Sequence, residues 1–350
     1  MATSGLEGVV VADTVLSHVD GERGELVIRG FPVRALAERG RLEDAIAVLW
    51  DGGAPGPDGD RWIPTLGAAR VRMWTAVARP EILGVGDAAV ALRAGLAPLD
   101  GASPIELVAA AGLIVAGWCR TLDGEPLLPP DPALDHAADL VRMIRGAPDP
   151  ARARALGRYL CTVADHGMNA STFTARVVAS TRSDPTSAVV AAVGALKGPL
   201  HGGAPGPVLD MLDAIRTPER AAEWIAAELA AGRRIMGLGH RVYKVRDPRV
   251  AVLEAAIAGL AEDGVSTERM ALAGAVERAA VAALAAHKPD RRLQANVEFA
   301  TAVLLEAVGI DRRAFTGTFG AGRVVGWLAH VAEQVETGRL IRPQSRYVGP

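Results

Sequence analysis

Apolar residues recur along this 350-residue chain mostly at the three- and four-residue spacing of helices, and they alternate only near its beginning. Residues 13–31 contain short β-like runs bounded by glycines, which predict a hairpin or an extended arm. Helices are predicted next over 35–50, in Ala-rich segments of 64–120 that Pro80, Pro98 and Pro104 separate, and over about 150–164. The last of these places Leu156, Leu160 and Val163 on one face.

The second half of the chain carries clear helix start and stop signals. Thr217-Pro218 and Asp247-Pro248 each combine an N-cap residue with proline at the first helical position. The predicted helices run from 217 to 232, from 247 onward, over 267–287, from 296 to 309 and from 320 to 338. Gly- and Pro-rich sequence predicts loops at 51–60 and 123–133. Because few alternating segments follow the N-terminal arm, we expect a mostly α-helical fold and disfavour a doubly wound α/β sheet.

Composition and charge narrow the class of protein. A chain of 36.3 kDa is long enough to form two domains and to bury a large core. Hydrophobic residues make up 50% but aromatic residues only 4%, which favours helices packed through small side chains. The 38 Lys and Arg against 40 Asp and Glu give a net charge of -2, which argues against a general nucleic-acid binder. An anionic ligand must therefore be met by local clusters of cationic residues.

The cysteines and the longest apolar run indicate the cellular compartment in which the protein is expected. Cys119 and Cys161 lie in apolar helical stretches and are expected to be reduced core residues, which suits a reducing cytosol. The N-terminus shows no basic segment followed by an apolar one, so no signal peptide is predicted. The run 107–119 falls short of the ~20 residues of a membrane span and predicts a buried helix. A cytoplasmic protein that binds no membrane is expected.

Three of the seven histidines lie beside glycines, where the chain can approach a ligand closely. His166 is in ADHGMNAST, His201 in KGPLHGGAPGP and His240 in MGLGHRVYKVRDPR. By contrast, His18, His136 and His287 are expected to be surface residues. Dinucleotide, P-loop, HExxH and GxSxG motifs are absent from the sequence. The glycines of GTFGAGRVVG (317–326) have the wrong spacing for a dinucleotide loop and instead predict close helix packing that delivers Arg323 to a site.

The basic run 241–249 and Glu298 each allow either a structural or a functional interpretation. The basic run 241–249 is either a solvated face or an anion site, the latter favoured by the helix N-terminus at Asp247-Pro248. Arg323 and Arg342 lie on or beside loops near the C-terminus, and converging arginines and histidines would suit a small dicarboxylate. Glu298, near the second position of its helix, is either a helix-stabilising residue or a general base. The spacing of His, Asp and Glu does not point to a metal site.

Five segments taken in order resemble the citrate synthase family over nearly the whole chain. They are DHGMNASTFTARVVAST (165–181), LKGPLHGGAPGPVLDML (196–212), IMGLGHRVYKVRDPR (235–249), NVEFATAVLLE (296–306) and FGAGRVVGWLAHVAEQ (319–334). The resemblance implies an all-α, two-domain subunit in a homodimer. Its large domain would take residues 1–203 and 310–350, and its small domain residues 204–309. It also implies condensation of acetyl-CoA with oxaloacetate and hydrolysis of citryl-CoA, with no metal or other cofactor.

The same resemblance implies roles for single residues. His201 would hydrogen-bond the thioester oxygen of the acetyl group, His240 would polarise the ketone of oxaloacetate, and Glu298 would be the catalytic base. Oxaloacetate would be held by His166, Arg249, Arg323 and Arg342, the last reaching the site of the partner subunit. Lys244 matches a position that contacts CoA, and neighbouring Arg246 is expected to join it.

The sequence departs from the family where the base is expected. The family usually has Asp in this motif, but this chain reads NVEF, so the carboxylate is one methylene further out. A misplacement of about 1 Å can cost ~100-fold in rate. The segment 300–302 also differs from the usual aromatic-Ser-Gly. Three hypotheses follow: a citrate synthase, a synthase acting on a longer acyl-CoA such as propionyl-CoA (giving 2-methylcitrate), or a weakly active homologue kept for ligand binding or regulation.

Overall fold

The computed structural model describes residues 6, 8–202, 205–239, 243, 245–265, 268–287 and 294–350. Its strands are β1 (Ser17–Asp20), β2 (Glu25–Ile28) and β3 (Phe31–Pro32). Its first helices are α1 (Val33–Ala37), α2 (Leu42–Ile46), α3 (Pro57–Asp60), α4 (Trp62–Val77), α5 (Pro80–Leu83), α6 (Ala88–Leu96), α7 (Pro104–Leu122), α8 (His136–Arg145) and α9 (Pro150–Val163). The others are α10 (Ala170–Ser180), α11 (Pro185–Leu196), α12 (Pro205–Ile215), α13 (Ala221–Ala230), α14 (Pro248–Glu262), α15 (Glu268–His287), α16 (Val297–Val308) and α17 (Phe315–Thr337).

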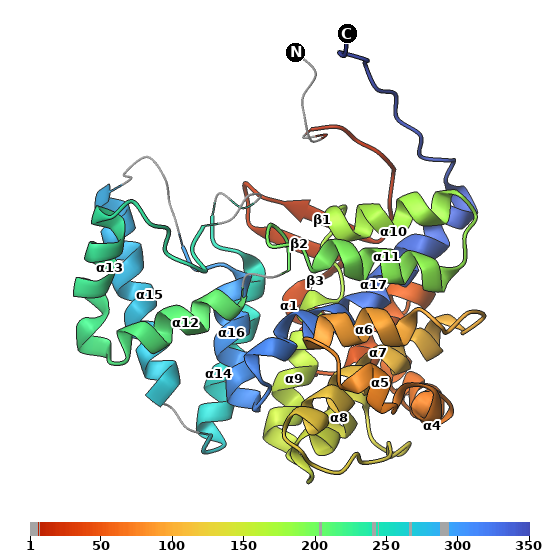
Figure 1. Cartoon of the computed structure of the whole chain (residues 1–350), viewed down its shortest axis with the longest axis horizontal. Helices are drawn as coiled ribbons and strands as arrows, with labels where there is room; N and C mark the ends of the chain where they lie inside the picture. The colour runs from red at the N-terminus through yellow and green to blue at the C-terminus, as the bar shows by residue number, and fades with distance from the viewer. Residues whose placement is uncertain are drawn as a thin grey trace.

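The N-terminal arm forms the hairpin that its alternating runs predict. Strands β1 and β2 pair antiparallel with Ser17 opposite Ile28, and β3 adds a short third strand. Leu26 and Ile28 turn inward and are buried, whereas the outward positions of the same strands are more exposed. The predicted mostly helical fold is confirmed, with this small sheet at one edge of the molecule (Figure 1).

The predicted single helix over 35–50 is wrong, because the chain breaks at Gly40. Helix α1 ends at Ala37, α2 begins at Leu42, and a π-helical turn over Ala47–Asp51 follows. Gly40 has a φ of 67°, and a Cβ there would lie 2.8 Å from the carbonyl oxygen of Arg154 in α9. The loop predicted at 51–60 also contains the one-turn helix α3, which begins with Pro57 at its first position.

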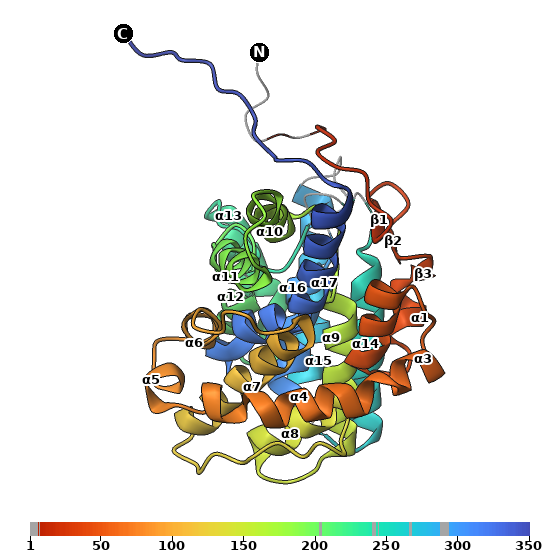
Figure 2. The ribbon, with the colours of Figure 1, turned by 90° about the vertical axis from the view of Figure 1, so that its right-hand side faces the viewer.

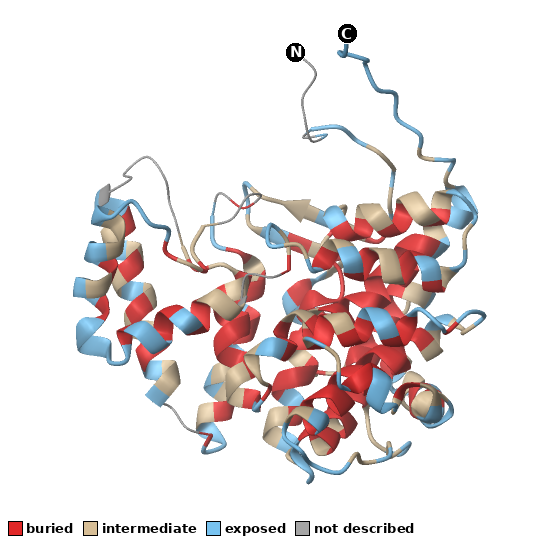
Figure 3. Ribbon diagram, in the orientation of Figure 1, coloured by how far each residue is buried: buried red, intermediate tan, exposed pale blue. Residues whose placement is uncertain are grey.

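Helix α7 is the centre of the core. Every residue from Leu107 to Arg120 is buried, and Figure 3 shows buried positions concentrated in the helices around it. By length and composition this 19-residue helix could cross a membrane, but 78% of its most apolar window is buried inside the molecule. Both cysteines are buried and free, as expected. The prediction that 107–119 forms a buried helix is therefore confirmed.

Helix α17 begins at Phe315, earlier than predicted, and runs beside α9 through the middle of the molecule (Figure 2). Its glycines lie where neighbours come closest. A Cβ on Gly322 would lie 2.8 Å from Val163, and one on Gly326 would lie 2.1 Å from the carbonyl oxygen of Ala164. The prediction that these glycines serve helix packing is confirmed, and the packing places Arg323 against the end of α9.

One histidine expected at the surface is buried. His136 is 1% exposed at the start of α8, and its backbone N–H donates to Glu43 Oε1 at 2.8 Å. Burial, with a smaller effect of the nearby Arg70 cation, holds the pKa of His136 well below its usual value. The local sequence could not predict this burial, because the charged residues beside His136, Glu43 and Arg70, come from distant segments.

Helices α12, α13 and α15 lie to one side of the molecule, away from α4–α8 (Figure 1). Helices α14 and α16 lie between the two groups, and both pack against α9. The division into a domain of residues 1–203 and 310–350 and a domain of residues 204–309 stays a prediction. What the fold does show is that α9, α14, α16 and α17 meet at one place.

Candidate active site

A cavity of about 880 Å³ opens where these helices meet. Its lining comes from six parts of the chain that are separated in sequence, the last two being 296–298 and 319–323. The residues are Leu6, Gly8, Val9 and Val11; His166, Met168, Asn169, Ala170 and Phe173; Leu200 and His201; Gly239 and Arg249; and Asn296, Val297, Glu298, Phe319 and Arg323. Five of the predicted site residues are thus together: His166, His201, Arg249, Glu298 and Arg323.

The turn between α9 and α10 positions His166. Gly167 has a φ of 61°, and its N–H donates to Asp165 Oδ2 at 3.2 Å. The side chain of Asn169 then caps α10 by accepting from the N–H groups of Ser171 and Thr172, both at 3.1 Å. The Nε2 atom of His166 lies 3.0 Å from the hydroxyl of Tyr243.

His201 follows α11 in a tight turn. Its N–H donates to the Gly198 carbonyl at 2.9 Å, and the N–H of Gly202 donates to the Leu196 carbonyl at 2.9 Å. The Nε2 atom of His201 lies 2.8 Å from the Ser171 hydroxyl. Burial, helped by the positive charge of Arg323, lowers the pKa of His201 to about 4. The imidazole is therefore neutral at pH 7, with Nδ1 left over for a ligand.

Glu298 lies in the first turn of α16. Asn296 caps this helix by accepting from the N–H of Glu298 at 3.1 Å, and its own amide donates to the Gly239 carbonyl at 2.9 Å. Burial is the main reason that the pKa of Glu298 is raised, with Arg249 acting in the opposite direction. Its Oε2 atom is buried without a hydrogen-bond partner among the described residues. A desolvated carboxylate of this kind is a stronger base than one in water.

Two buried arginines line the same cavity as this carboxylate and histidine. Arg249 is 3% exposed and binds Asp247 through Nε (3.0 Å) and Nη2 (2.6 Å). Burial opposes its charge, but the Asp247 carboxylate outweighs that effect and raises the pKa of Arg249.

Among the described residues, Arg323 has no such carboxylate partner. It is 1% exposed, its Nε donates to the Val163 carbonyl, and its Nη2 is unpaired within the part of the chain described here. Burial above all, and also the charge of Arg249, lowers its pKa to about 10, so it stays protonated at neutral pH. A buried cation with an unused donor favours an anionic ligand.

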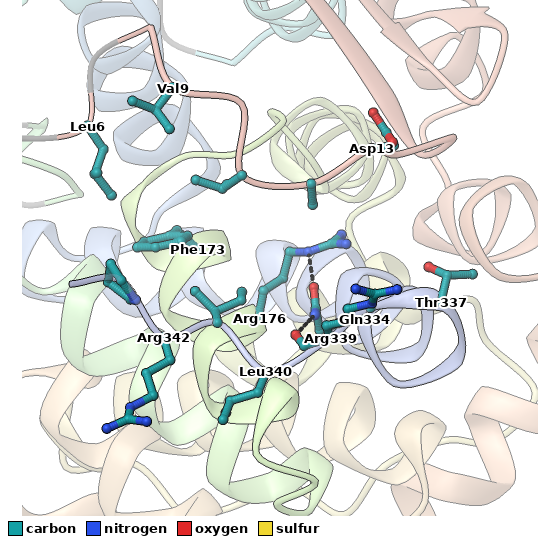
Figure 4. Close-up of a pocket in the computed structure, with 15 residues that line it drawn as sticks. Leu6, Val9, Asp13, Phe173, Arg176, Gln334, Thr337, Arg339, Leu340 and Arg342 are labelled. Atoms are coloured by element: carbon teal, nitrogen blue, oxygen red, sulfur yellow. Dashed lines mark hydrogen bonds between the residues drawn. The ribbon is translucent and has the colours of Figure 1, made fainter.

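The other predicted site residues are not in this cavity or are not described. Arg246 is on the surface, where it pairs with Glu254 and lies 3.9 Å from Glu277. Arg342 lines a neighbouring cavity of about 570 Å³, and Figure 4 shows its guanidinium pointing away from Arg176 and Gln334. His240 and Lys244 lie outside the described residues.

Comparison with known proteins decides the family. The sequence model of the citrate synthase C-terminal domain matches residues 5–344. The chain belongs to the citrate synthase family. The all-α fold of the family, predicted from the resemblance, is confirmed.

Relatives agree with this over almost the whole chain. A citrate synthase of Haloferax volcanii is 34% identical over 99% of this chain and 95% of its own length. A 2-methylcitrate synthase of Mycobacterium tuberculosis is 34% identical over 99% of this chain and 90% of its own. The citrate synthase of Thermoplasma acidophilum was solved as a ternary complex with carboxymethyl coenzyme A and oxaloacetate. It superposes with a TM-score of 0.89 at 27% identity and covers 100% of this chain and 97% of that one.

Three residues that contact the site residues of this citrate synthase family member were not predicted as such from the sequence. Ser171 contacts His201, Tyr243 contacts His166, and Asp247 holds Arg249. Only Asp247 had a signal, since its N-cap position was recognised but its ion pair was not. Among the described residues, no group of three or more His, Cys, Asp or Glu side chains is arranged to hold a metal ion.

Proposed function

We propose that this enzyme condenses acetyl-CoA with oxaloacetate and hydrolyses the resulting citryl-CoA to citrate and CoA. One observation carries the proposal: a single cavity holds a desolvated carboxylate, a neutral histidine and two buried arginines. These are the groups needed to remove a proton from a thioester methyl and to hold an oxo-diacid beside it. The family of the chain and the substrates named for the Thermoplasma structure support the same reaction.

In the first step Glu298 takes a proton from the acetyl methyl group. His201 donates from Nδ1 to the thioester oxygen, so that the enol form is stabilised as charge develops there. Because burial raises the pKa of Glu298, the proton transfer is less uphill than it would be to a solvated carboxylate. The enol carbon then attacks the ketone of oxaloacetate, with His240 proposed as donor to that carbonyl. Water finally hydrolyses the thioester.

Oxaloacetate is proposed to be held by His166, Arg249 and Arg323. Arg323 Nη2, which has no partner among the described residues, supplies a donor for a carboxylate, and His166 lines the same cavity. Two guanidinium groups fix the substrate in one orientation, which brings its ketone to the nucleophilic carbon. Arg342 is proposed to act on the cavity of a partner subunit in a homodimer, and Lys244 and Arg246 on CoA. A cytoplasmic location is also proposed, in keeping with the two free, buried cysteines.

A synthase acting on propionyl-CoA is the second candidate. The cavity has a volume of about 880 Å³, and its lining includes the apolar side chains of Met168 and Phe173, which a longer acyl group could contact. Ala300, at a position where the sequence departs from the family, lines a separate apolar groove between α14, α15 and α16 rather than this cavity. One methylene changes binding by only about 1–3 kcal/mol, so the two activities differ in degree.

A single assay tests the proposal. Release of the free CoA thiol is followed with oxaloacetate and acetyl-, propionyl- or butyryl-CoA in turn. We expect the highest kcat/KM with acetyl-CoA. A higher value with propionyl-CoA identifies the second candidate. No turnover with any of the three, together with intact oxaloacetate binding by calorimetry, refutes both and leaves the weakly active homologue.

A further inference from the structure

A buried group of three polar side chains lies behind the turn that carries His166. His330 of α17 contacts the other two: its Nε2 atom is 3.1 Å from Asp165 Oδ1, and its Nδ1 atom is 2.9 Å from Arg176 Nη1. His330 and Asp165 are 0% exposed, and Arg176 is 1% exposed. Asp165 is next to His166 in the sequence, so this group is joined to the cavity through the backbone of one residue.

The hydrogens of Arg176 fix the state of His330. A guanidinium can only donate, so Nδ1 of His330 accepts and carries no proton. The Nη1 atom of Arg176 also donates to Glu333 Oε2 at 2.6 Å, and its Nε atom donates to Gln334 Oε1 at 2.9 Å. Because Glu333 balances the charge of the arginine, His330 is left as a neutral imidazole with its proton on Nε2.

The Nε2–H of His330 has the Asp165 carboxylate as its acceptor. Burial acts to raise the pKa of Asp165, but chiefly the interaction with His330 outweighs burial and lowers it to about 2, so Asp165 is ionised at pH 7. Its other oxygen, Oδ2, accepts from the N–H of Gly167 at 3.2 Å. One oxygen is thus bound by α17 and the other by the residue that follows His166, so the carboxylate closes a small loop around His166.

Helix α17 also carries Arg323, about two turns before His330. The contact between His330 and Asp165 ties the turn of His166 to this helix, so two groups proposed to hold oxaloacetate keep a fixed spacing. Groups that clamp a substrate are effective only at the correct spacing. Loss of the contact should therefore weaken the binding of oxaloacetate.

We infer that His330 is a positioning residue for oxaloacetate: Arg176 holds it as the neutral Nε2–H imidazole, and it anchors the turn of His166 through the Asp165 carboxylate. The inference rests on the proposed role of His166 in binding oxaloacetate. It also gives a chemical reason for a carboxylate and a histidine that are fully buried behind the cavity and do not line it.

Substitutions that keep or remove the two hydrogen bonds of His330 test the inference. His330→Leu removes both, whereas His330→Gln keeps a donor for Asp165 and an acceptor for Arg176. A hydrogen bond to a charged group corresponds to roughly a tenfold effect or more, so we expect KM for oxaloacetate to rise about tenfold in His330→Leu and less than about twofold in His330→Gln. KM for acetyl-CoA should change by less than about twofold in both, because the turn of His166 is proposed to hold only oxaloacetate.

The matched control is His136→Leu. His136 is likewise buried beside an arginine, with Nδ1 3.5 Å from Arg70 Nη1, but it does not line the cavity. This substitution should lower the stability of the protein and leave KM for oxaloacetate unchanged.

A second variant keeps the test decisive if His330→Leu does not fold. Asp165→Asn has the same shape, but it offers an NH₂ group to one of the two donors that the carboxylate accepts, and it should raise KM for oxaloacetate by a similar factor. Where both substitutions fold, His330→Leu in an Asp165→Asn background should have less than about a twofold further effect, because His330 acts through Asp165.

Spectroscopy reads the state of the histidines without turnover. The ring nitrogens are observed by ¹⁵N NMR at pH 7 in the absence of substrate, and the signals of His330 and His166 are assigned by comparison with His330→Gln and His166→Ala. We expect the proton of His330 on Nε2 alone. The signals of His166 should shift in His330→Leu or Asp165→Asn, and they should stay in place in His136→Leu.

Two results overturn the inference: a proton on Nδ1 of His330 in the wild type, or a KM for oxaloacetate that His330→Leu and Asp165→Asn change no more than His136→Leu does. If the acyl-CoA assay shows no turnover, the proposed function is wrong. The signals of His166 then still decide whether His330 positions the turn, since they are measured without substrate.

Discussion

Glu298 stands where the citrate synthase motif usually has Asp, and the structure shows where its longer side chain lies. Its backbone is fixed by the Asn296 cap, and its carboxylate is desolvated beside the Arg249 cation. The cap sets where the helix begins, so the extra methylene extends the side chain into the cavity. A glutamate at this position therefore lines the cavity, where we propose that its carboxylate acts as the base.

Replacing Glu298 by glutamine should abolish turnover. The isosteric amide keeps the shape but cannot accept the proton, and loss of a general base costs roughly 10²–10⁴-fold in rate. CoA release gives the rate, and calorimetry should give an oxaloacetate affinity close to that of the wild type. Glu306→Gln is the control, since Glu306 is on the same helix but pairs with Arg269 at the surface. A Glu298→Gln enzyme with wild-type turnover would show that the base is another residue.

The acid side of the pH profile should follow the protonation of Glu298. Its pKa is raised, so kcat/KM falls as pH drops through that value and the base becomes protonated. His201, with a pKa of about 4, stays neutral over this range and adds no second protonation. We expect a tenfold fall per pH unit when kcat/KM is measured from pH 8 to 4.5. A hundredfold fall per unit would mean that an ordinary histidine titrates with the carboxylate.

At the scale of an element, α17 depends on glycines for its position. Gly326 lies against the Ala164 carbonyl, at the end of the helix that leads to His166, and Arg323 and Trp327 flank it on the same helix. The close approach of α17 to α9 is thus what brings the arginine and the Ser171–His201 pair to one cavity.

Gly326→Ala should destabilise the protein, because the new methyl would have to displace α17 from α9. Overpacking of this kind costs about 1–3 kcal/mol. Gly194→Ala is the control: it lies in α11 with no atom within 4 Å of a Cβ, and it should stabilise by about 0.5–1 kcal/mol. Urea unfolding followed by circular dichroism measures both. Equal effects of the two substitutions would contradict the packing argument.

At the scale of the whole molecule, the C-terminal segment 338–350 leaves the body as an extended tail near the N-terminal arm (Figure 1). Arg342 lies on this tail, outside the cavity that holds the other arginines. Its proposed role therefore concerns a second subunit rather than its own.

Mixed subunits test this role. An Arg342→Ala subunit keeps an intact His201, and a His201→Ala subunit keeps an intact Arg342, so one site of a mixed dimer is complete. We expect the mixture to regain up to about a quarter of wild-type activity, on statistical pairing into closed two-fold dimers. No recovery after subunit exchange is verified by mass spectrometry would refute the role in trans.

Local sequence predicts much of this fold because its signals act within one turn of a helix. Asp247-Pro248 starts α14, Asn296 caps α16, and Gly309 ends it with a φ of 91°. The break at Gly40 could not be predicted in this way, because its cause is the approach of α9, which begins more than a hundred residues later. Buried His136 was missed for the same reason.

By itself the sequence determined the helical class, most helix boundaries and, through ordered motifs, the family and the residue types that carry the chemistry. Only the tertiary structure decided that Arg249 has a carboxylate partner whereas Arg323 keeps a donor that is unpaired among the described residues. It also decided that His201 is neutral and that Ser171 lies between His201 and Trp327. The physical reason is that desolvation and hydrogen-bond partnership depend on groups brought together from separate helices, and no local pattern records which groups those are.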